Sequence, residues 1–411
     1  MGNVYDVLQE RGFVEQVTDP EGLKELLGSE RVTCYIGFDP TAKSFHVGNL
    51  LPIMALAHMQ RAGHRPIALM GGGTGLIGDP SGKKEMRRIM SREEIQQNAE
   101  ALKGQLSRFL DFEGRRALLL NNAEWLTKLN YIEFLRDIGR HFSVNRMLAA
   151  ETYRLRFETT GLNFVEFNYM LLQAYDFLHL WRHYGCRLQM GGSDQWGNIC
   201  AGVDLIRRVE GGTAYGMVFP LLTTATGEKM GKTERGAVWL DPELTSPYEF
   251  YQYWINVDDR DVERFLALFT FLPMEEVRRL GALQGEELRE AKEVLAYEVT
   301  KFVHGEDEAR RAQETSRRAF RGEAGDLEAL PTTFLEEERL REGIPAYELF
   351  ALTGLAATKS EARRLISQGG GYLNGERLRA FDQLITLEHL QGGELLLRAG
   401  KKRYHRVVVV K

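Results

Sequence analysis

The sequence predicts an α/β protein with a Rossmann-like doubly wound parallel sheet, followed by an α-helical domain and a small basic C-terminal domain. Short β-like runs alternate with longer helical patterns in the first half of the chain. Helical periodicity without strands then continues from about residue 247 to 321, and positive charge collects at the C-terminal end. A chain of 411 residues also exceeds what one hydrophobic core usually holds, which favours about two to three domains.

Five short runs rich in β-branched, aromatic and other apolar residues are the candidate strands. They are residues 31–38, 65–70, 117–120, 186–190 and 215–219. Helical patterns at 50–61, 91–112 and 194–209 fall between them. Because strand and helix alternate, the strands are expected to be parallel.

Three polar or glycine-rich segments follow predicted strands. They are Asp39-Pro40-Thr41, residues 71–84, and Gly191-Gly192-Ser193-Asp194-Gln195. Ligands of doubly wound sheets bind outside the carboxyl ends of the strands, so these segments are expected to form a ligand site.

The domain boundaries follow from these patterns and from the charge. We expect the sheet domain at residues 1–222, a helical domain at 223–322, an acidic linker at 323–344 and a basic domain at 345–411. The last segment has eleven Lys and Arg against six Asp and Glu, a net charge of +5 in a chain of net charge −5. Such asymmetry favours a polyanionic partner for the tail, although a solvated basic face would have the same composition.

The composition excludes several classes of protein. With 43% hydrophobic and 27% charged residues, the chain is typical of a soluble globular protein. No apolar stretch approaches a membrane span, and the first residues have no signal-peptide layout, so a cytoplasmic location without membrane contact is expected. Cys34, Cys186 and Cys200 are far apart, which argues against a zinc site and a disulfide framework.

Tyr169, Gln173 and Asp176 are separated by offsets that place them on one face of a helix whose other residues are mostly apolar. Burying a phenol, an amide and a carboxylate together costs several kcal/mol unless polar groups meet them. Either a satisfied core hydrogen-bond network or a ligand would provide those groups.

Residues 73–78 match the GxGxxG pattern of dinucleotide-binding enzymes. Asp79-Pro80 interrupts the segment where that fingerprint needs a helix, and the capping box Ser91-x-x-Glu94 predicts that the helix starts later. A nicotinamide-dependent dehydrogenase is therefore disfavoured. The loop still offers glycine amides and polar side chains to a ligand, among them Asp79, Lys83 and Arg87.

Two further segments have the composition of phosphate-binding sites. His46-Val47-Gly48-Asn49 opens the predicted helix at 50–61, and a helix N-terminus favours phosphate. Lys229-Met230-Gly231-Lys232-Thr233 is a glycine-containing loop with two ammonium groups and a hydroxyl. Alone, the first would usually be a helix cap and the second a surface turn.

Together these motifs resemble those of one family. His46 to Asn49 resembles the HIGH signature, and Lys229 to Thr233 the KMSKS loop, of class I aminoacyl-tRNA synthetases. With Tyr35, the loop at 78–83, the Tyr169, Gln173 and Asp176 face and the segment 191–198, the chain resembles the bacterial tyrosyl-tRNA synthetases over nearly its whole length. The tail, with residues 358–364, three glycines at 369–371 and Asn374-Gly375, resembles a small α+β RNA-binding fold shared with a ribosomal protein.

This resemblance implies an enzyme with two reactions. L-tyrosine and ATP, with Mg²⁺, give tyrosyl-adenylate and pyrophosphate, and the tyrosyl group then moves to the 3′ end of tRNA(Tyr). It also implies a homodimer and no tightly bound protein metal. In the first reaction the protein positions the substrates and stabilises charge on the phosphates without a covalent role.

The resemblance also implies residue roles. Asp176 and Tyr35 would contact the phenolic hydroxyl, and Tyr169, Gln173 and Asp79 the α-ammonium, with Gln195 at the tyrosine carboxylate. A charged hydrogen bond left unmade costs about 1.5 to 3 kcal/mol, so phenylalanine should be rejected. The residues implied in catalysis are Thr41, His46, Asn49, Lys83, Arg87, Lys229 and Lys232. Those implied at ATP are Gly37, Asp39, His46, Gly48, Asn49, Gly192, Asp194, Lys229, Met230, Lys232 and Thr233, and those at tRNA are Lys359, Arg363 and Arg364.

Two positions depart from the family signatures. Asn49 stands where the family often has His; an Asn amide can donate the same hydrogen bond to phosphate but carries no charge. The lysine loop has Gly231 and Thr233 in place of Ser and keeps both lysines. A tryptophanyl enzyme, a dehydrogenase and a non-catalytic RNA-binding protein remain as alternatives. The first should lack the pair Tyr35 and Asp176.

Overall fold

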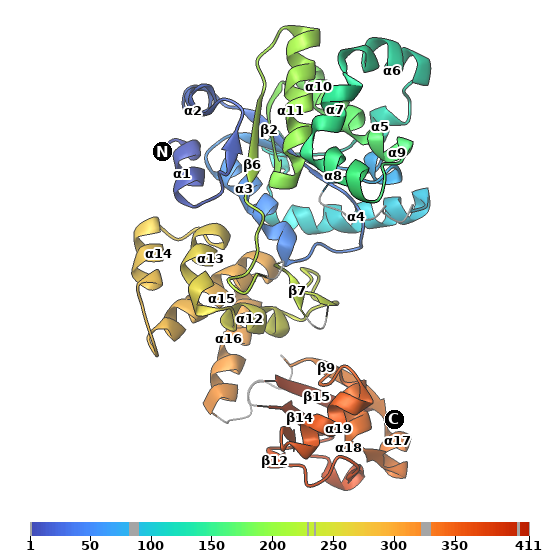
Figure 1. Ribbon diagram of the computed structural model, residues 1–411. Helices are drawn as coiled ribbons and strands as arrows, with labels where there is room; N and C mark the ends of the chain where they lie inside the picture. Colours follow the sequence, from blue (N-terminus) through green and yellow to red (C-terminus); the bar gives the residue numbers. More distant parts are fainter. Residues whose placement is uncertain are drawn as a thin grey trace. The chain divides into compact units, whose positions relative to one another are not determined.

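The computed structural model describes residues 2–81, 90–227, 230–233, 236–321, 330–400 and 403–410, with only the backbone described at 151, 152, 155, 232, 233 and 319–321. The chain forms two compact units (Figure 1). The first comprises Met1–Gly231 and Asp258–Gln284, and the second Lys232–Val257 and Gly285–Lys411.

A six-stranded sheet forms the centre of the first unit, in the order β1-β6-β5-β2-β3-β4. Strands β2 to β6 pair in parallel, and the chain order reverses between β2 and β5, as in doubly wound nucleotide-binding sheets. The strands are β1 (Gln16–Val17), β2 (Thr33–Phe38), β3 (Arg65–Met70), β4 (Leu118–Asn121), β5 (Cys186–Gly192) and β6 (Tyr215–Phe219).

The five predicted strands are confirmed, but the sheet is not purely parallel. The short strand β1 pairs with β6 in antiparallel orientation, which makes the sheet mixed. The sequence analysis missed β1 because two residues are too few to show an alternating pattern.

Helices surround this sheet, and three of them matter most for the cavity described below: α3 (Leu50–Arg61), α10 (Tyr169–Tyr184) and α11 (Trp196–Glu210). Helix α3 has the predicted bounds, and α11 starts after a 3-10 turn rather than at residue 194. The other helices of this unit are α1 (Val4–Glu10), α2 (Pro20–Ser29), α4 (Arg92–Phe109), α5 (Ala123–Leu126), α6 (Tyr131–Asp137), α7 (Val144–Ala149), α8 (Glu151–Thr159), α9 (Phe164–Phe167), α13 (Val262–Phe269) and α14 (Met274–Gly281).

The start of helix α4 decides whether the GxGxxG-like segment after β3 opens a helix. The Ser91 hydroxyl accepts from the Glu94 amide, and the Glu94 carboxylate accepts from the Ser91 amide, so the predicted capping box is present. The helix therefore opens at Arg92, well after the GxGxxG-like segment. Within the described residues, the GxGxxG-like segment contains a 3-10 turn and no α-helix whose N-terminus would hold a pyrophosphate.

Helix α10 is held by its apolar residues. Phe177, Leu178 and Leu180 are fully buried in the main core of the unit, together with Tyr35 of β2. Gly185 ends the helix with a φ of +61°, a conformation that glycine adopts without strain. The helix is thus fixed against the sheet, with its start near the carboxyl ends of the strands.

Residues 258–284 belong to the first unit, although the sequence analysis placed them in the helical domain. The Arg11 guanidinium, which is buried, donates to the carbonyls of Ala267 at 2.8 Å and Thr270 at 2.9 Å. The ring of Phe271 lies 4.9 Å from that of His58 on α3. These contacts join α13 to α3 and α1, and no sequence period signals them.

The second unit combines three helices with a small sheet domain. The helices are α12 (Pro247–Ile255), α15 (Leu288–His304) and α16 (Glu306–Arg321). The sheet has the order β12-β11-β14-β15-β9, and α18 (Ala346–Leu352) and α19 (Lys359–Ser367) share its core. Its strands are β9 (Thr332–Glu336), β11 (Gly371–Leu373), β12 (Glu376–Arg377), β14 (Glu394–Ala399) and β15 (Arg403–Val410); the remaining elements are α17 (Glu337–Glu342) and the short strands β7 (Lys232–Thr233), β8 (Gly236–Ala237), β10 (Ile344–Pro345) and β13 (Leu384–Ile385).

Two features of the tail bear on the sequence analysis. Asn374 and Gly375 have φ values of +50° and +87°, which forms the predicted Asn-Gly turn between β11 and β12. The stretch 323–344, expected to be a linker, contains β9 and α17, and β9 pairs in parallel with β15. The short strand Thr-Thr-Phe-Leu-Glu was not predicted because the surrounding stretch is acidic. Its partner lies about seventy residues later in the chain.

Two sequence expectations concern helices and cysteines. None of the helices in the described part of the chain is long and apolar enough to span a membrane. Cys34 and Cys186 are fully buried, and burial raises the pKa of both thiols, whereas Cys200 is only half-buried.

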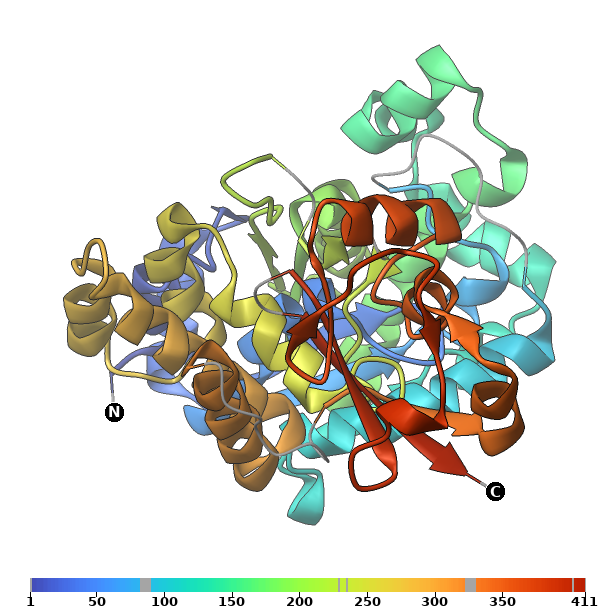
Figure 2. The same ribbon diagram turned by 90° about the horizontal axis from the view of Figure 1, so that it is seen from below.

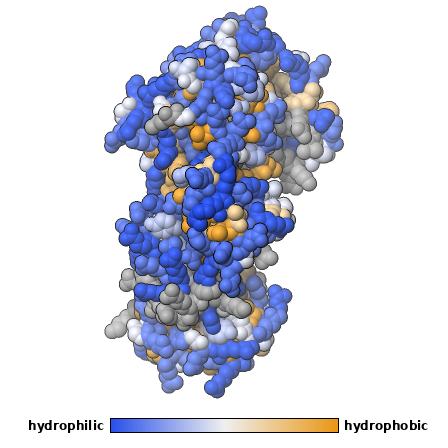
Figure 3. Space-filling view, turned by 90° about the vertical axis from the view of Figure 1, so that its left-hand side faces the viewer, coloured by the Kyte–Doolittle hydropathy of each residue, from blue (hydrophilic) through white to orange (hydrophobic). Residues whose placement is uncertain are grey.

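One face of the molecule is largely hydrophilic, with apolar residues in small separate areas (Figure 3).

Candidate active site

A cavity of about 350 Å³ lies in the first unit at the carboxyl ends of β2 and β5. It occupies the point where the chain order of the sheet reverses, which is where doubly wound folds bind ligands. The structure brings most of the predicted site residues to it: Tyr35, Gly37, Asp39, Thr41, His46, Asn49, Asp79, Tyr169, Gln173, Asp176, Gly192, Asp194 and Gln195.

Asp176 is the buried carboxylate of this cavity, with 2% of its surface exposed. The Asn122 amide donates to one of its oxygens at 2.8 Å, and the Trp125 indole N–H donates to the other at 2.7 Å. Burial raises the pKa of Asp176 to about 7, and these two hydrogen bonds oppose the rise. The carboxylate is therefore oriented by two donors and is close to its ionisation point at neutral pH.

Tyr35 faces the same cavity from β2. Its ring lies 5.4 Å from that of Phe177, and the side chain is 1% exposed. Its hydroxyl is buried, and none of the residues that the structure describes forms a hydrogen bond with it. An unpaired buried hydroxyl costs about 1 to 3 kcal/mol, so a polar ligand group at this position would be stabilised. Burial, followed by the nearby Asp176 charge, raises the pKa of Tyr35 well above its usual value, which keeps the phenol neutral.

Asn122 joins the carboxylate to the glycine loop. Its side-chain carbonyl accepts from the Gly73 amide at 2.7 Å, and its amide nitrogen also donates to the Thr74 hydroxyl at 3.0 Å. Only 1% of the residue is exposed. The Asn122 side chain, which follows β4, thus positions both the loop after β3 and the Asp176 carboxylate on α10.

A second polar network lies where β5 meets α11. The Gln195 amide donates to Asp79 at 2.7 Å, and Asp79 also accepts from the Ser81 backbone amide at 2.9 Å. Asn198 donates to both Gln195 and Ser81 at 3.2 Å. Asp79 and Gln195, far apart in the sequence, therefore act as one structural unit at the rim of the cavity.

Asp39 directly follows β2, and two hydroxyl groups approach its carboxylate. The hydroxyls of Tyr169 and Thr74 each lie 3.5 Å from one of its oxygens, at the limit of hydrogen-bond distance. Gly71 stands close by, and a Cβ there would come within 2.5 Å of the same oxygen. A side chain at Gly71 would therefore require Asp39 and Thr74 to move.

His46 and Asn49 form a reciprocal cap on the 3-10 turn Val47–Asn49 that leads into α3. The His46 ring accepts at Nδ1 from the Gly48 amide at 3.0 Å, which places the proton of the neutral ring on Nε2. The Asn49 side-chain oxygen accepts from the His46 amide at 3.0 Å, which leaves its NH₂ group as the end that can donate to a ligand. Capping and ligand binding are thus compatible here.

The segments resembling HIGH and KMSKS touch each other through two glycines. A Cβ on Gly231 would lie 2.9 Å from the Gly48 backbone nitrogen, and a Cβ on Gly48 would lie 3.3 Å from the Met230 carbonyl oxygen. Gly231 also has a φ of +81°, and Met230 is buried. Close backbone approach explains why Gly stands where the family signature has Ser.

Several predicted residues are not placed in this cavity. Lys83, Arg87 and Lys229 lie outside the described residues, as do the side chains of Lys232 and Thr233, whose backbone forms β7. Among the side chains that the structure describes, no three His, Cys, Asp or Glu residues group as metal ligands.

The predicted tRNA contacts lie on the exposed side of α19. Lys359 pairs with Glu348 at 3.1 Å, and the Arg363 guanidinium stacks on the Tyr347 ring at 4.2 Å. Arg364 is exposed on the same helix.

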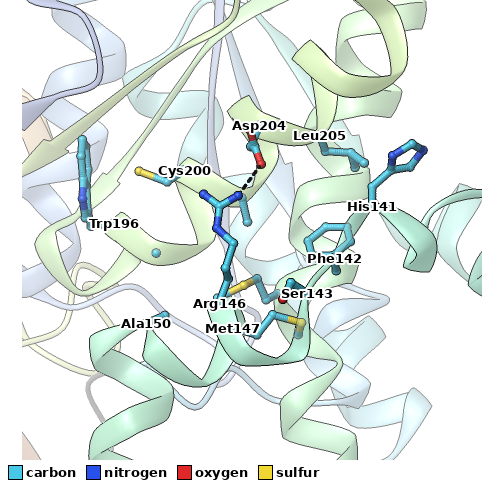
Figure 4. A pocket seen from close by; sticks show the side chains of 13 residues that line it. His141, Phe142, Ser143, Arg146, Met147, Ala150, Trp196, Cys200, Asp204 and Leu205 are labelled. Carbon is cyan, nitrogen blue, oxygen red and sulfur yellow. Dashed lines mark ion pairs between the residues drawn. The ribbon is translucent and has the colours of Figure 1, made fainter.

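A second cavity of about 260 Å³ lies between α7 and α11 (Figure 4). Arg146 reaches across it to Asp204 at 3.6 Å, and Asp204 also pairs with Arg207 and Arg208. The Asp204 carboxylate thus pairs with three guanidinium groups. None of the residues that line this cavity is a predicted site residue.

The sequence analysis missed Asn122 and Trp125, which orient Asp176. Asn122 follows a predicted strand next to β3, so its position at the carboxyl edge of the sheet was a usable signal. Trp125 gave none, because an indole in a short apolar helix usually belongs to the core.

Two family models match the chain. The model described as tRNA synthetases class I (W and Y) matches residues 28–321, and the model of the tyrosine–tRNA ligase SYY-like C-terminal domain matches residues 327–407.

Individual proteins agree with these models. The chain is 59% identical to the tyrosine–tRNA ligase of Desulfatibacillum aliphaticivorans, over 99% of each chain, and 60% identical to that of Syntrophus aciditrophicus (strain SB), over 98% of each. Among solved structures it resembles a C-terminally truncated mitochondrial tyrosyl-tRNA synthetase of Aspergillus nidulans, with a TM-score of 0.70, 33% identity, and coverage of 77% of this chain and 94% of that one.

Proposed function

We propose the residue roles below from the premise that this chain belongs to the class I tRNA synthetases of the tryptophan and tyrosine group, and within it to the tyrosine–tRNA ligases. Enzymes of this family join tyrosine to ATP to form tyrosyl-adenylate and pyrophosphate, and then transfer the tyrosyl group to tRNA. The dehydrogenase and non-catalytic alternatives are thereby set aside. The assignment of individual residues is our proposal.

Asp176 and Tyr35 recognise the phenol of the substrate. The phenol O–H donates to the Asp176 carboxylate, and the Tyr35 hydroxyl supplies the second hydrogen bond. The single observation that carries this proposal is the unpartnered Tyr35 hydroxyl in the cavity that also contains the oriented Asp176 carboxylate. Phenylalanine would leave both groups unsatisfied, at a cost of about 1.5 to 3 kcal/mol for the charged one.

The other end of tyrosine lies toward the rim. Tyr169, Gln173 and Asp79 contact the α-ammonium, and Gln195 orients the α-carboxylate. The hydrogen bond between Gln195 and Asp79 supports this division, because it places a negative group and an amide side by side. The α-ammonium and the α-carboxylate of an amino acid are also neighbouring groups, so Asp79 and Gln195 can contact both ends of this pair together.

ATP occupies the part of the cavity next to His46 and Asn49. The His46 Nε2–H group, the Asn49 amide and the Thr41 hydroxyl donate to the phosphates. Asp194 contacts the ribose next to the backbone of Gly192. Lys229 and Lys232 add positive charge, with Lys83 and Arg87 at the pyrophosphate. Gly37, Asp39, Gly48, Met230 and Thr233 complete the ATP site.

The reaction needs only positioning and charge stabilisation from these residues. The tyrosine carboxylate oxygen attacks the α-phosphorus in line, a new P–O bond forms, and the bond to the pyrophosphate oxygen breaks. Donors fixed before the reaction stabilise the charge on the leaving pyrophosphate. We propose that Mg²⁺ enters with ATP as part of the substrate, since phosphate oxygens are its usual ligands.

The function as a whole is tested by ATP–pyrophosphate exchange with each of the twenty amino acids. Tyrosine should stimulate exchange far above the others, including phenylalanine and tryptophan. Equal stimulation by tryptophan, or none by tyrosine, would contradict the proposal.

For tRNA, we propose that Lys359, Arg363 and Arg364 on α19 contact the phosphate backbone. The net charge of +5 over residues 345–411 supports this, because phosphate contacts dominate protein–RNA affinity. We assign catalysis to the sheet domain together with the lysine loop at 229–233, and tRNA binding to the helical region and the tail. A cytoplasmic location is consistent with an enzyme that acts on tRNA.

We also propose that the enzyme is a homodimer that associates through α6 to α9. Large apolar side chains more than a third exposed are concentrated there, and Figures 1 and 2 show these helices grouped at one side of the unit. Exposed apolar area of this kind marks protein contacts. The residues are Tyr131, Ile132, Leu135, Val144, Phe157, Phe164 and Val165.

A further inference from the structure

Two stacked rings lie behind the Asp176 carboxylate. The Trp125 indole and the His179 imidazole have their centroids 4.1 Å apart, with an angle of 14° between their planes. The edge of the same indole donates its N–H to Asp176 at 2.7 Å. His179 therefore contacts the side chain that holds the carboxylate, and it lies outside the substrate cavity.

Both the hydrogen-bond acceptor and the stacking partner of the indole come from α10. Trp125 lies on α5, a helix of only four residues, and a helix of one turn has little stability of its own. His179 lies on α10 three residues after Asp176, so both side chains leave the same helix face. The ring of His183, an exposed residue, lies 4.3 Å from that of His179 at an angle of 40° and is not stacked on it. The well-buried helix α10 thus positions both partners of the indole.

His179 is neutral near pH 7. Burial, followed by the charges of His183 and Arg182, lowers its pKa to about 4. A neutral imidazole stacks on the indole as an aromatic ring and adds no charge beside Asp176. A phenyl ring of similar size would make the same contact.

We propose that His179 is a positioning residue for tyrosine recognition, because its ring fixes the Trp125 indole and thereby the orientation of the Asp176 carboxylate. This inference rests on the proposed role of Asp176. It adds a specificity determinant that touches neither substrate.

The test compares His179→Ala with His179→Phe in the full-length chain. His183→Ala is the matched control, because it removes an exposed neighbouring ring, leaves the stack on the indole, and should leave the ratio below unchanged. Steady-state ATP–pyrophosphate exchange gives kcat, the KM for each substrate, and the ratio of kcat/KM for tyrosine to that for phenylalanine. His179→Ala should raise the KM for tyrosine and lower this ratio by about five- to tenfold, with kcat and the KM for ATP within about twofold of wild type.

His179→Phe should return the ratio to within about twofold of wild type, since it restores the aromatic contact. An unchanged ratio in His179→Ala would overturn the inference, as would a uniform loss of kcat and of affinity for both substrates that Phe does not rescue. Asp176→Asn distinguishes a failure of the His179 proposal from a failure of the role proposed for Asp176. If it changes the ratio while His179→Ala does not, only the stack is refuted; if Asp176→Asn also leaves the ratio unchanged, the assignment of Asp176 fails.

Discussion

The Asn122 side chain donates to Asp176 at 2.8 Å, and through its carbonyl it accepts from the loop that follows β3. Because both residues are almost completely buried, water cannot replace either hydrogen bond. The residue that we propose to recognise the tyrosine phenol is therefore coupled to a loop that lines the cavity.

Asn122→Ala should lower kcat/KM for tyrosine by about ten- to a hundredfold, because a buried carboxylate loses a charge-assisted donor worth about 1.5 to 3 kcal/mol. Pyrophosphate exchange at low tyrosine measures this. Asn256→Ala, which removes an exposed amide after α12, is the control and should leave kcat/KM for tyrosine unchanged. A wild-type value for Asn122→Ala would show that Trp125 alone orients Asp176.

The raised pKa of Asp176 predicts a pH dependence for tyrosine use. With a pKa of about 7 in the free enzyme, the carboxylate is protonated as pH falls below 7 and becomes a weaker acceptor for the phenol. We expect kcat/KM for tyrosine to decrease as pH falls through about 7. A profile that is flat between about pH 6 and 8 would contradict this.

The same shift has a consequence for stability. The folded pKa lies above the ordinary value of 3.8, so the folded state binds the proton more tightly than the unfolded chain. Asp176 should therefore lower the free energy of unfolding as pH rises from about 4 to 7.

The contact between the two glycines is tested by Gly231→Ala. The new methyl group would lie 2.9 Å from the Gly48 nitrogen, so the lysine loop must move away from His46. We expect the rate of tyrosyl-adenylate formation at saturating substrates to fall by about tenfold, with little change in the KM for tyrosine. Gly227→Ala is a matched control, because Gly227 has a similar φ of +85° and no atom within 4 Å of the added Cβ. Equal losses in both variants would attribute the effect to backbone strain.

Removal of the tail should separate the two reactions. Because β9 pairs with β15, the deletion should start before Thr332 and remove residues 330–411; a cut at 345 would leave β9 as an exposed edge strand. We expect adenylate formation to persist and tRNA charging to fall strongly at physiological salt. Undiminished charging would refute RNA binding by the tail.

Periodicity and turn chemistry predicted much of the fold. The bounds of β3, β6 and α3 agree with those expected, since each is a short apolar run between clear breakers. The strands β1 and β9 were missed because β1 has only two residues and β9 lies in an acidic stretch, so neither shows an alternating apolar pattern.

The site was predictable where polar residues interrupt an apolar pattern. Tyr169, Gln173 and Asp176 stand out for that reason, and the cavity contains all three. Trp125 and His179 do not stand out, because aromatic residues near apolar ones are ordinary in a core. Their contribution depends on a stack between α5 and α10, which only the folded chain reveals.

The central claim is that the buried hydroxyl of Tyr35 and the carboxylate of Asp176 together select the phenol. Its most direct test is the equilibrium binding of L-tyrosine and L-phenylalanine to the wild-type enzyme and to Tyr35→Phe, measured by calorimetry. We predict that Tyr35→Phe weakens tyrosine binding by about two- to tenfold, the value of one hydrogen bond, and leaves phenylalanine binding equal or slightly stronger. Equal weakening for both amino acids, or no change for tyrosine, would contradict the account.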